Sequence, residues 1–248
     1  MKRVVKKPKM ILFDYGQTLL CEPDSDFLRG EEALFGYIKS NRNNLTPMQV
    51  CDFSKVLFER VKRVRDLNVD IHEWQFLKFL YEYLEIELSI SYPEAEKIFW
   101  NHVSAGALMP NADVVIAYIK ECGIRSGVIS NLMFSSEALQ ERINRMLPDN
   151  HFEFIIATSQ YIFRKPDPLI FELALRKAGL NAEDVWFCGD NVRADVDGAA
   201  AVGIFPVWYD NKTVMDEKRE PADDVVPSCE HLHIHDWLDL IDVLGRAQ

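Results

Sequence analysis

Short apolar runs that alternate with helical patterns constrain the fold of this chain more than any other feature. The first run covers residues 10–13 and ends at one carboxylate, Asp14. Later runs cover residues 124–129, 152–157, 185–188 and 204–208, and helices are expected at 111–122, 136–147, 168–179 and 193–202. Strands that alternate with helices predict an α/β fold in which helices cover both faces of a parallel sheet.

Residues 21–104 follow a different pattern, with frequent helical signals and no convincing strand. Apolar residues recur there at intervals of three and four, for example Val50, Phe53 and Leu57. Three segments resemble capped helix starts: Thr46-Pro47-x-Gln49, Asp70-x-x-Glu73 and Ser91-x-Pro93-Glu94. We therefore expect an all-helical subdomain at 21–104, inserted into a core formed by residues 1–20 and 105–248.

Composition excludes several classes of protein. No apolar run approaches the roughly 18 residues of a membrane-spanning helix, and Asp14 interrupts the stretch that follows the basic N-terminus, so we expect neither a membrane segment nor a signal peptide. The net charge of −11 argues against nucleic-acid binding. Five scattered cysteines without a Cys-x-x-Cys pair fit a cytoplasmic protein without a disulfide framework. The sequence defines no particular oligomeric state.

Polar residues follow several of the expected strands, where open parallel sheets bind their ligands. They are Asp14, Ser130, Asn131, Lys165, Asp190 and Asp195. The set supplies a carboxylate nucleophile, a hydroxyl, an amide, a fixed cation and an acidic pair. Mg²⁺ prefers oxygen ligands, and a transferred phosphoryl group needs positive charge around its oxygens. This inventory favours phosphoryl transfer assisted by magnesium.

Four ordered motifs contain these residues: FDYGQT at 13–18, GVISN at 127–131, RKPDP at 164–168 and FCGDNVRADVDGA at 187–199. In this order the motifs resemble the haloacid dehalogenase-like hydrolase superfamily, whose members are mostly phosphatases. The resemblance covers nearly the whole chain. It implies a Rossmann-like three-layer core, with residues 21–104 as a helical cap over the site.

The resemblance also implies a role for each residue. Asp14 would attack the substrate phosphorus and form an aspartyl phosphate. Ser130, Asn131 and Lys165 would bind the phosphoryl oxygens, with Lys165 also neutralising Asp14. The ligands of Mg²⁺ would be Asp14, Asp190, Asp195 and the backbone carbonyl of Gly16, with Asp195 either a direct ligand or a group that orients a bound water. The substrate would be a small phosphorylated metabolite.

Gly16 departs from the family pattern, which usually has an aspartate there as general acid and base. Loss of such a group typically costs a factor of about 10²–10⁴ in rate. One alternative is a slow or selective phosphatase in which another residue holds the water: Gln17, Tyr15, Glu22, Asp24 or Asp26. A second is a 2-haloacid dehalogenase, although the acidic pair argues against it. A third is a catalytically weak or inactive member that binds a phosphorylated ligand or partner.

Three histidines near the C-terminus, His231, His233 and His235, alternate with apolar residues. On a strand they would share one face, where they could bind zinc or nickel. The alternation with Leu232 and Ile234 favours a simpler interpretation, an edge strand with one solvent-exposed side.

Overall fold

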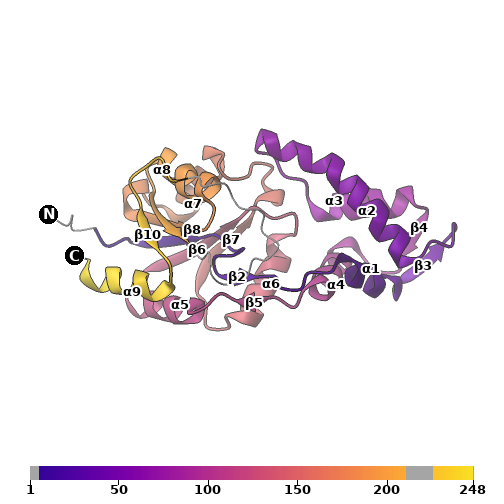
Figure 1. The fold of residues 1–248 in the computed structure, drawn as a ribbon, viewed down its shortest axis with the longest axis horizontal. Helices are drawn as coiled ribbons and strands as arrows, with labels where there is room; N and C mark the ends of the chain where they lie inside the picture. The colour runs from indigo at the N-terminus through magenta and orange to yellow at the C-terminus, as the bar shows by residue number, and fades with distance from the viewer. Residues whose placement is uncertain (1–5, 211–225, 248) are drawn as a thin grey trace.

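Six parallel strands form the central sheet, in the order β10-β9-β8-β1-β6-β7 (Figure 1). The computed structural model describes residues 6–210 and 226–247. The strands are β1 (Met10–Phe13), β6 (Arg125–Ser130), β7 (Phe152–Ala157), β8 (Val185–Gly189), β9 (Phe205–Tyr209) and β10 (Leu232–Ile234). This arrangement confirms the predicted parallel α/β fold, and each expected strand is found within one residue of its predicted bounds.

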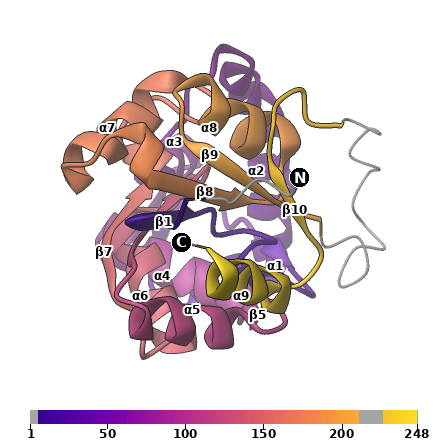
Figure 2. The ribbon, with the colours of Figure 1, turned by 90° about the vertical axis from the view of Figure 1, so that its left-hand side faces the viewer.

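Helices cover both faces of the sheet, as Figure 2 shows. On one face lie α5 (Ala112–Glu121), α6 (Ser136–Met146) and α9 (Trp237–Arg246), and on the other lie α7 (Pro168–Ala178) and α8 (Gly198–Ala201). Strand β1 contributes to both layers, because Ile11 and Phe13 face the first and Met10 and Leu12 face the second. Burial on both faces explains why β1 is apolar throughout until Asp14.

The helix expected at 193–202 is irregular. A π-helical turn at Val192–Asp197 precedes the short helix α8, and the side chain of Asn191 caps the turn by accepting a hydrogen bond from the Ala194 N–H at 2.8 Å. Such turns often mark functional sites. Here the turn contains Asp195, one of the predicted site residues.

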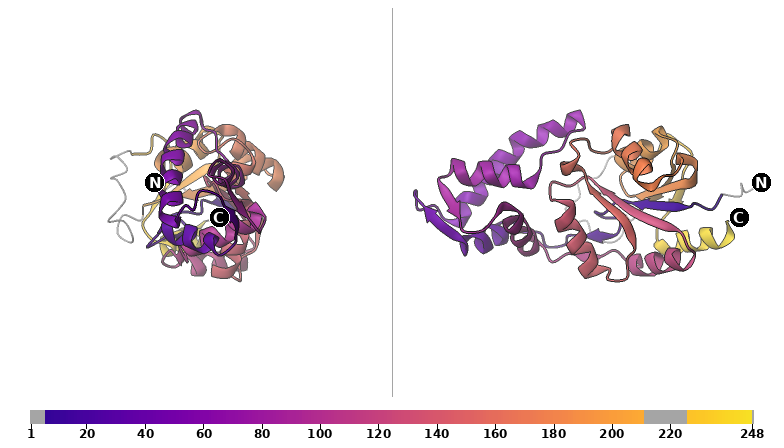
Figure 3. Two further views of the ribbon diagram at one scale, coloured as in Figure 1. Left: turned by 90° about the vertical axis from the view of Figure 1, so that its right-hand side faces the viewer. Right: turned by 180° about the vertical axis from the view of Figure 1, so that it is seen from behind.

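Most of the segment between β1 and α5 forms a second body at the carboxyl end of the sheet (Figures 1 and 3). It contains α1 (Phe27–Phe35), α2 (Pro47–Val61), α3 (Glu73–Tyr83) and α4 (Tyr92–Val103), with a 3₁₀ turn at Lys62–Leu67. It also contains an antiparallel pair, β3 (Ile38–Asn41) and β4 (Ile86–Leu88), so the expectation of an all-helical cap was incomplete. The two strands are too short and too polar to give a periodic signal. We keep residues 21–104 as the proposed extent of this cap.

Two of the three expected helix starts are confirmed. Thr46 and Ser91 each form a capping box with the residue three positions later. The third was wrong, because His72 caps α3 and Asp70 is buried against basic side chains. The strands β2 (Leu20–Cys21) and β5 (Ala107–Leu108) form a further pair, which lies where the chain enters and leaves the cap. Within the described residues, none of the helices is long and apolar enough to span a membrane.

The contact between α1 and α4 gives a test of the cap packing. A β-carbon at Gly30 would lie 2.7 Å from side-chain carbons of the buried residues Phe99 and Val103. Gly30→Ala should therefore destabilise the protein by about 1–3 kcal/mol, although alanine favours an isolated helix. Thermal unfolding of Gly30→Ala beside Gly36→Ala measures this, since a β-carbon at Gly36 meets its nearest atom at 3.4 Å. An unchanged or higher Tm for Gly30→Ala would contradict the packing.

Candidate active site

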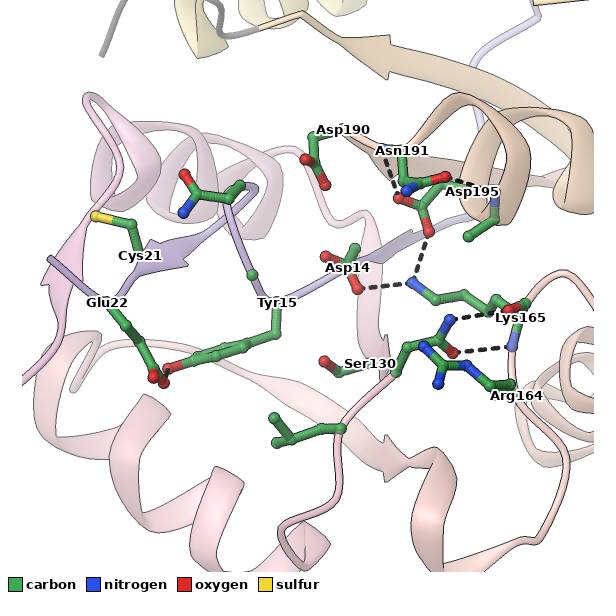
Figure 4. A pocket seen from close by; sticks show the side chains of 15 residues that line it. Asp14, Tyr15, Cys21, Glu22, Ser130, Arg164, Lys165, Asp190, Asn191 and Asp195 are labelled. Carbon is green, nitrogen blue, oxygen red and sulfur yellow. Dashed lines mark hydrogen bonds and ion pairs between the residues drawn. The ribbon is translucent and has the colours of Figure 1, made fainter. Parts of the chain in front are cut away.

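The candidate active site lies at the carboxyl edge of the sheet, beside its central strand. The chain leaves β1 for β6 on one side and later returns to β8 on the other, so the connections change direction at β1. Ligands of open α/β sheets bind at such a point. A pocket of about 320 Å³ lies there, and it is lined by Asp14, Gly16, Ser130, Asn131, Lys165, Asp190 and Asp195 among others. The structure thus brings together all seven predicted site residues (Figure 4).

Lys165 is the central contact of the site. Its Nζ donates hydrogen bonds to Asp14 Oδ1 and to Asp195 Oδ1, each at 2.6 Å. The side chain is 1% exposed, and its ammonium lies 4.9 Å from the centre of the Phe187 ring. Figure 4 shows the lysine extended between the two carboxylates. Lys165 is 151 positions from Asp14 in the sequence, yet this contact fixes the orientation of the Asp14 carboxylate.

The turn after β8 determines where Asp195 points. Its Oδ2 accepts a hydrogen bond from the Asn191 N–H at 3.0 Å, while Oδ1 is held by Lys165. A β-carbon at Gly189 would collide with the Asp195 carboxylate, so only glycine leaves room for this arrangement. Both oxygens of Asp195 are therefore engaged within the protein.

Burial and charge set the protonation of the central pair. Burial raises the pKa of Asp14 to about 6, although attraction to the Lys165 ammonium opposes the shift. Burial alone would lower the pKa of Lys165, but its attraction to Asp14 and Asp195 outweighs this and raises it. At neutral pH the amine is charged and Asp14 is largely ionised, which is the state a carboxylate nucleophile needs.

Three carboxylates of the pocket could hold a metal ion. Ligand oxygens of Asp14, Asp190 and Asp195 lie within 4.8 Å of one another. Lys165 supplies one positive charge against these three acids, so a further cation would balance the cluster. All three are hard oxygen donors, and such a set suits Mg²⁺. The backbone of Asp190 is held by Trp208, because the indole N–H donates a hydrogen bond to the Asp190 backbone carbonyl at 3.3 Å.

Ser130 and Asn131 have different places in the site: Ser130 lies beside Asp14, and Asn131 is hydrogen-bonded to the backbone of Lys165. Ser130 ends β6 and lies beside Asp14 in Figure 4. The Asn131 amide donates to the Lys165 carbonyl and its oxygen accepts from the Lys165 N–H, both at 2.8 Å. Asn131 therefore holds the backbone of the lysine in place, and its predicted contact with phosphate stays a prediction.

Sequence reasoning missed an ion pair that joins the cap to the loop of Lys165. Asp70 Oδ1 accepts from Arg164 Nη1 at 3.3 Å, and Asp70 Oδ2 accepts from the Thr158 hydroxyl at 2.5 Å. The Asp70 N–H also donates to the Ile162 carbonyl at 2.8 Å. The two partners are 94 positions apart, so no local signal could have paired them.

A second network occupies the far side of the pocket. Glu22 Oε1 accepts hydrogen bonds from Tyr15 Oη at 3.2 Å, Trp100 Nε1 at 2.7 Å and Arg142 Nη1 at 3.2 Å. Burial, followed by the charge of Glu22, raises the pKa of Tyr15 well above its usual range. Tyr15 thus stays protonated. Figure 4 shows its hydroxyl directed at Glu22. Within the described part of the chain, α1 to α4 contribute no residue to the pocket lining.

Gly16 leaves space where the family pattern usually has an acid. A β-carbon built at this position meets no atom of the described residues within 4 Å. Gln17, the next residue, has a φ of 56° and also lines the pocket. A β-carbon at position 16 would therefore displace none of its described neighbours.

The parallel sheet, the aspartate beyond its central strand and the buried lysine define a Rossmann-like enzyme with a carboxylate-rich site. A family model described as haloacid dehalogenase-like hydrolase matches residues 8–203, and the chain belongs to this family of hydrolases. The match confirms the resemblance seen in the four motifs.

Curated relatives and solved structures agree with this assignment. The chain is 25% identical to glyceraldehyde 3-phosphate phosphatase of Pyrococcus abyssi over 205 residues, which is 81% of each chain. It is 26% identical to phosphoserine phosphatase of Thermus thermophilus over 117 residues, 47% of this chain and 46% of that protein. Its fold resembles a HAD phosphatase of Thermococcus onnurineus (TM-score 0.62, 17% identity, 96% and 98% covered). It equally resembles a 2-haloacid dehalogenase of Pseudomonas syringae pv. Tomato (TM-score 0.62, 20% identity, 96% and 99% covered).

The ion pair between Asp70 and Arg164 gives the test of this subsection. Asp70→Ala leaves a largely buried guanidinium without its partner, and we expect it to lower the free energy of unfolding by about 3 kcal/mol. Asp66→Ala, an exposed change a few residues earlier, should alter it by less than about 0.5 kcal/mol. Urea unfolding of both variants measures the difference. Equal effects would contradict the structural role of the pair.

Proposed function

We propose that this protein is a magnesium-dependent phosphatase that hydrolyses a small phosphorylated metabolite through an aspartyl phosphate on Asp14. The observation that carries the proposal is the placement of Lys165 between Asp14 and Asp195, with Asp190 beside them. The size of the pocket is at the lower end of small-molecule sites. Relatives named as phosphatases of glyceraldehyde 3-phosphate and phosphoserine support the substrate class.

The chemistry begins at Asp14. Its carboxylate attacks the substrate phosphorus while the bond to the leaving oxygen breaks, which yields an acyl phosphate and a free alcohol or alkoxide. The Lys165 ammonium stabilises the charge on the phosphoryl oxygens. The Ser130 hydroxyl donates a hydrogen bond to one of these oxygens. Water then attacks the phosphorus, releases inorganic phosphate and restores Asp14.

The carboxylate cluster supports a proposal for the metal ligands. Asp14, Asp190 and the carbonyl of Gly16 would hold Mg²⁺ directly. Both oxygens of Asp195 are already engaged, so we assign it to orienting Lys165 and the water around the ion. When bound, the ion supplies positive charge that draws the phosphate and the nucleophile together.

An acid would assist the departure of the leaving group and a base would assist the attack of water, and Gly16 can provide neither. Glu22 is held by three donors and Tyr15 stays protonated, so neither is suited to replace the missing acid and base. Asp24 and Asp26 lie outside the pocket lining, and the amide of Gln17 can hold a water but not exchange a proton at neutral pH. We infer that the enzyme favours leaving groups that depart without protonation. The absence of an acid and base at position 16 also supports the alternative of a family member that binds a phosphorylated ligand with little turnover.

The nucleophile is tested by assaying the purified protein with Mg²⁺ on aryl and alkyl phosphates, beside Asp14→Asn. Aryl esters should be hydrolysed faster, because phenolates leave without a proton, and Asp14→Asn should abolish the activity. Asp24→Asn, an exposed change, serves as the matched control.

Two results would contradict the proposed function. Binding of phosphate analogues without hydrolysis of either ester class would favour the binding protein. Chloride release from a 2-haloacid in the presence of a chelator would favour a dehalogenase.

Position 16 is tested by restoring the acid. Gly16→Asp should accelerate the hydrolysis of alkyl phosphates by a factor of about 10² or more, since it restores an acid and base and its β-carbon meets no neighbour. Gly16→Asn has nearly the same shape but cannot exchange a proton, and it should give no gain. Similar rates for the two variants and the wild-type protein would mean that proton transfer is not what position 16 lacks.

A further inference from the structure

A second group of side chains of the types that ligate metals lies at the same edge of the sheet, outside the proposed active site. Asp210 follows β9 directly, and His233 and His235 lie on and just after β10, the neighbouring strand. The prediction of an edge strand here is confirmed, because Leu232 and Ile234 pack on the core and His233 and His235 are exposed, whereas His231 precedes the strand and is half-buried. The carboxylate, however, was not part of that prediction.

The geometry of the group is compact. Ligand atoms of Asp210, His233 and His235 all lie within 4.8 Å of one another. His233 Nε2 donates to Asp210 Oδ2 at 3.1 Å, and His235 Nδ1 lies 3.9 Å from the same oxygen. In a tetrahedral zinc site, ligand atoms about 2.0–2.1 Å from the ion are about 3.3 Å apart. His235 Nδ1 also lies 3.1 Å from the Asp210 carbonyl oxygen, and a metal ion bound at this nitrogen would replace that contact.

The surroundings hold the group in place. The His233 ring stacks on Trp208 with a centroid distance of 4.2 Å and an angle of 18° between the rings. The Asp210 side chain is only 9% exposed, whereas the His235 side chain is 69% exposed. One fixed carboxylate and one stacked imidazole therefore lie beside an imidazole that solvent can reach, which leaves a path for an ion to enter.

We propose that Asp210, His233 and His235 form a second metal site that takes Zn²⁺ or a similar transition-metal ion. Two imidazoles and one carboxylate suit such ions and not Mg²⁺, which prefers oxygen ligands alone. Three protein ligands leave a fourth position for water, as in open zinc sites. The site differs in donor chemistry from the cluster of Asp14, Asp190 and Asp195, so the two would select different ions.

The two sites are neighbours through Trp208. One face of its indole stacks on His233, and its N–H donates to the carbonyl of Asp190. An ion at the histidine site would fix the His233 ring and with it the indole. The metal site therefore borders the proposed active site without sharing a ligand with it.

The test is isothermal titration of the full chain with Zn²⁺ after removal of bound metal, in a buffer with excess Mg²⁺. The wild-type protein should bind one more Zn²⁺ per chain than His233→Gln, His235→Gln or Asp210→Asn. Each change should weaken this site by more than about tenfold, the loss that even an outer-shell partner of a metal can cause. Zn²⁺ bound by the carboxylate cluster is common to all four proteins and cancels in the comparison.

His231→Gln is the matched control. His231 directly precedes β10, and its ring centroid is 6.2 Å from that of His233, but it is not one of the three grouped residues. It should retain the additional Zn²⁺. The proposal is overturned if the wild-type protein binds no more Zn²⁺ than the three variants, or if His231→Gln loses the ion as well. Circular dichroism of each variant verifies that the fold is intact.

Discussion

The rest of the site depends on one buried contact, the ammonium of Lys165 between the carboxylates of Asp14 and Asp195. A buried charge is costly unless it is paired, and removing one partner leaves the other uncompensated. The protein therefore surrounds this contact with supports. Asn131 holds the backbone of Lys165, and the glycine at position 189 leaves room for Asp195. The same contact orients Asp14 toward the pocket.

Much of the fold and of the candidate site could be predicted from the sequence. The strands were recognisable because each is a buried apolar run. Open parallel sheets bind their ligands beyond the carboxyl ends of the strands, and this rule then selected Asp14, Ser130 and Asp190. The four motifs indicated the family, which the family model confirms. These successes share a cause: the information lies within a few consecutive residues or in the order of the elements.

The features that could not be predicted depend on contacts between distant segments. Asp70 looked like a helix cap, yet it pairs with Arg164 across 94 positions. Glu22 meets Arg142 across 120 positions, and β3 pairs with β4 through segments of three and four residues. The alternating histidines were visible, but the carboxylate beside them comes from the end of another strand. Side-chain networks of this kind are set by the packing and leave no periodic pattern.

The central claim, that Asp14 carries the phosphoryl group, can be tested by chemical trapping. Without an acid at position 16, water attack on the acyl phosphate should be the slow step with an aryl phosphate, so the intermediate should accumulate. Borohydride added during turnover reduces an aspartyl phosphate to homoserine, which peptide mass mapping locates. We predict homoserine at position 14 in the wild-type protein and none in Asp14→Asn. Steady turnover with residue 14 unmodified, or with the modification at another residue, would contradict this mechanism.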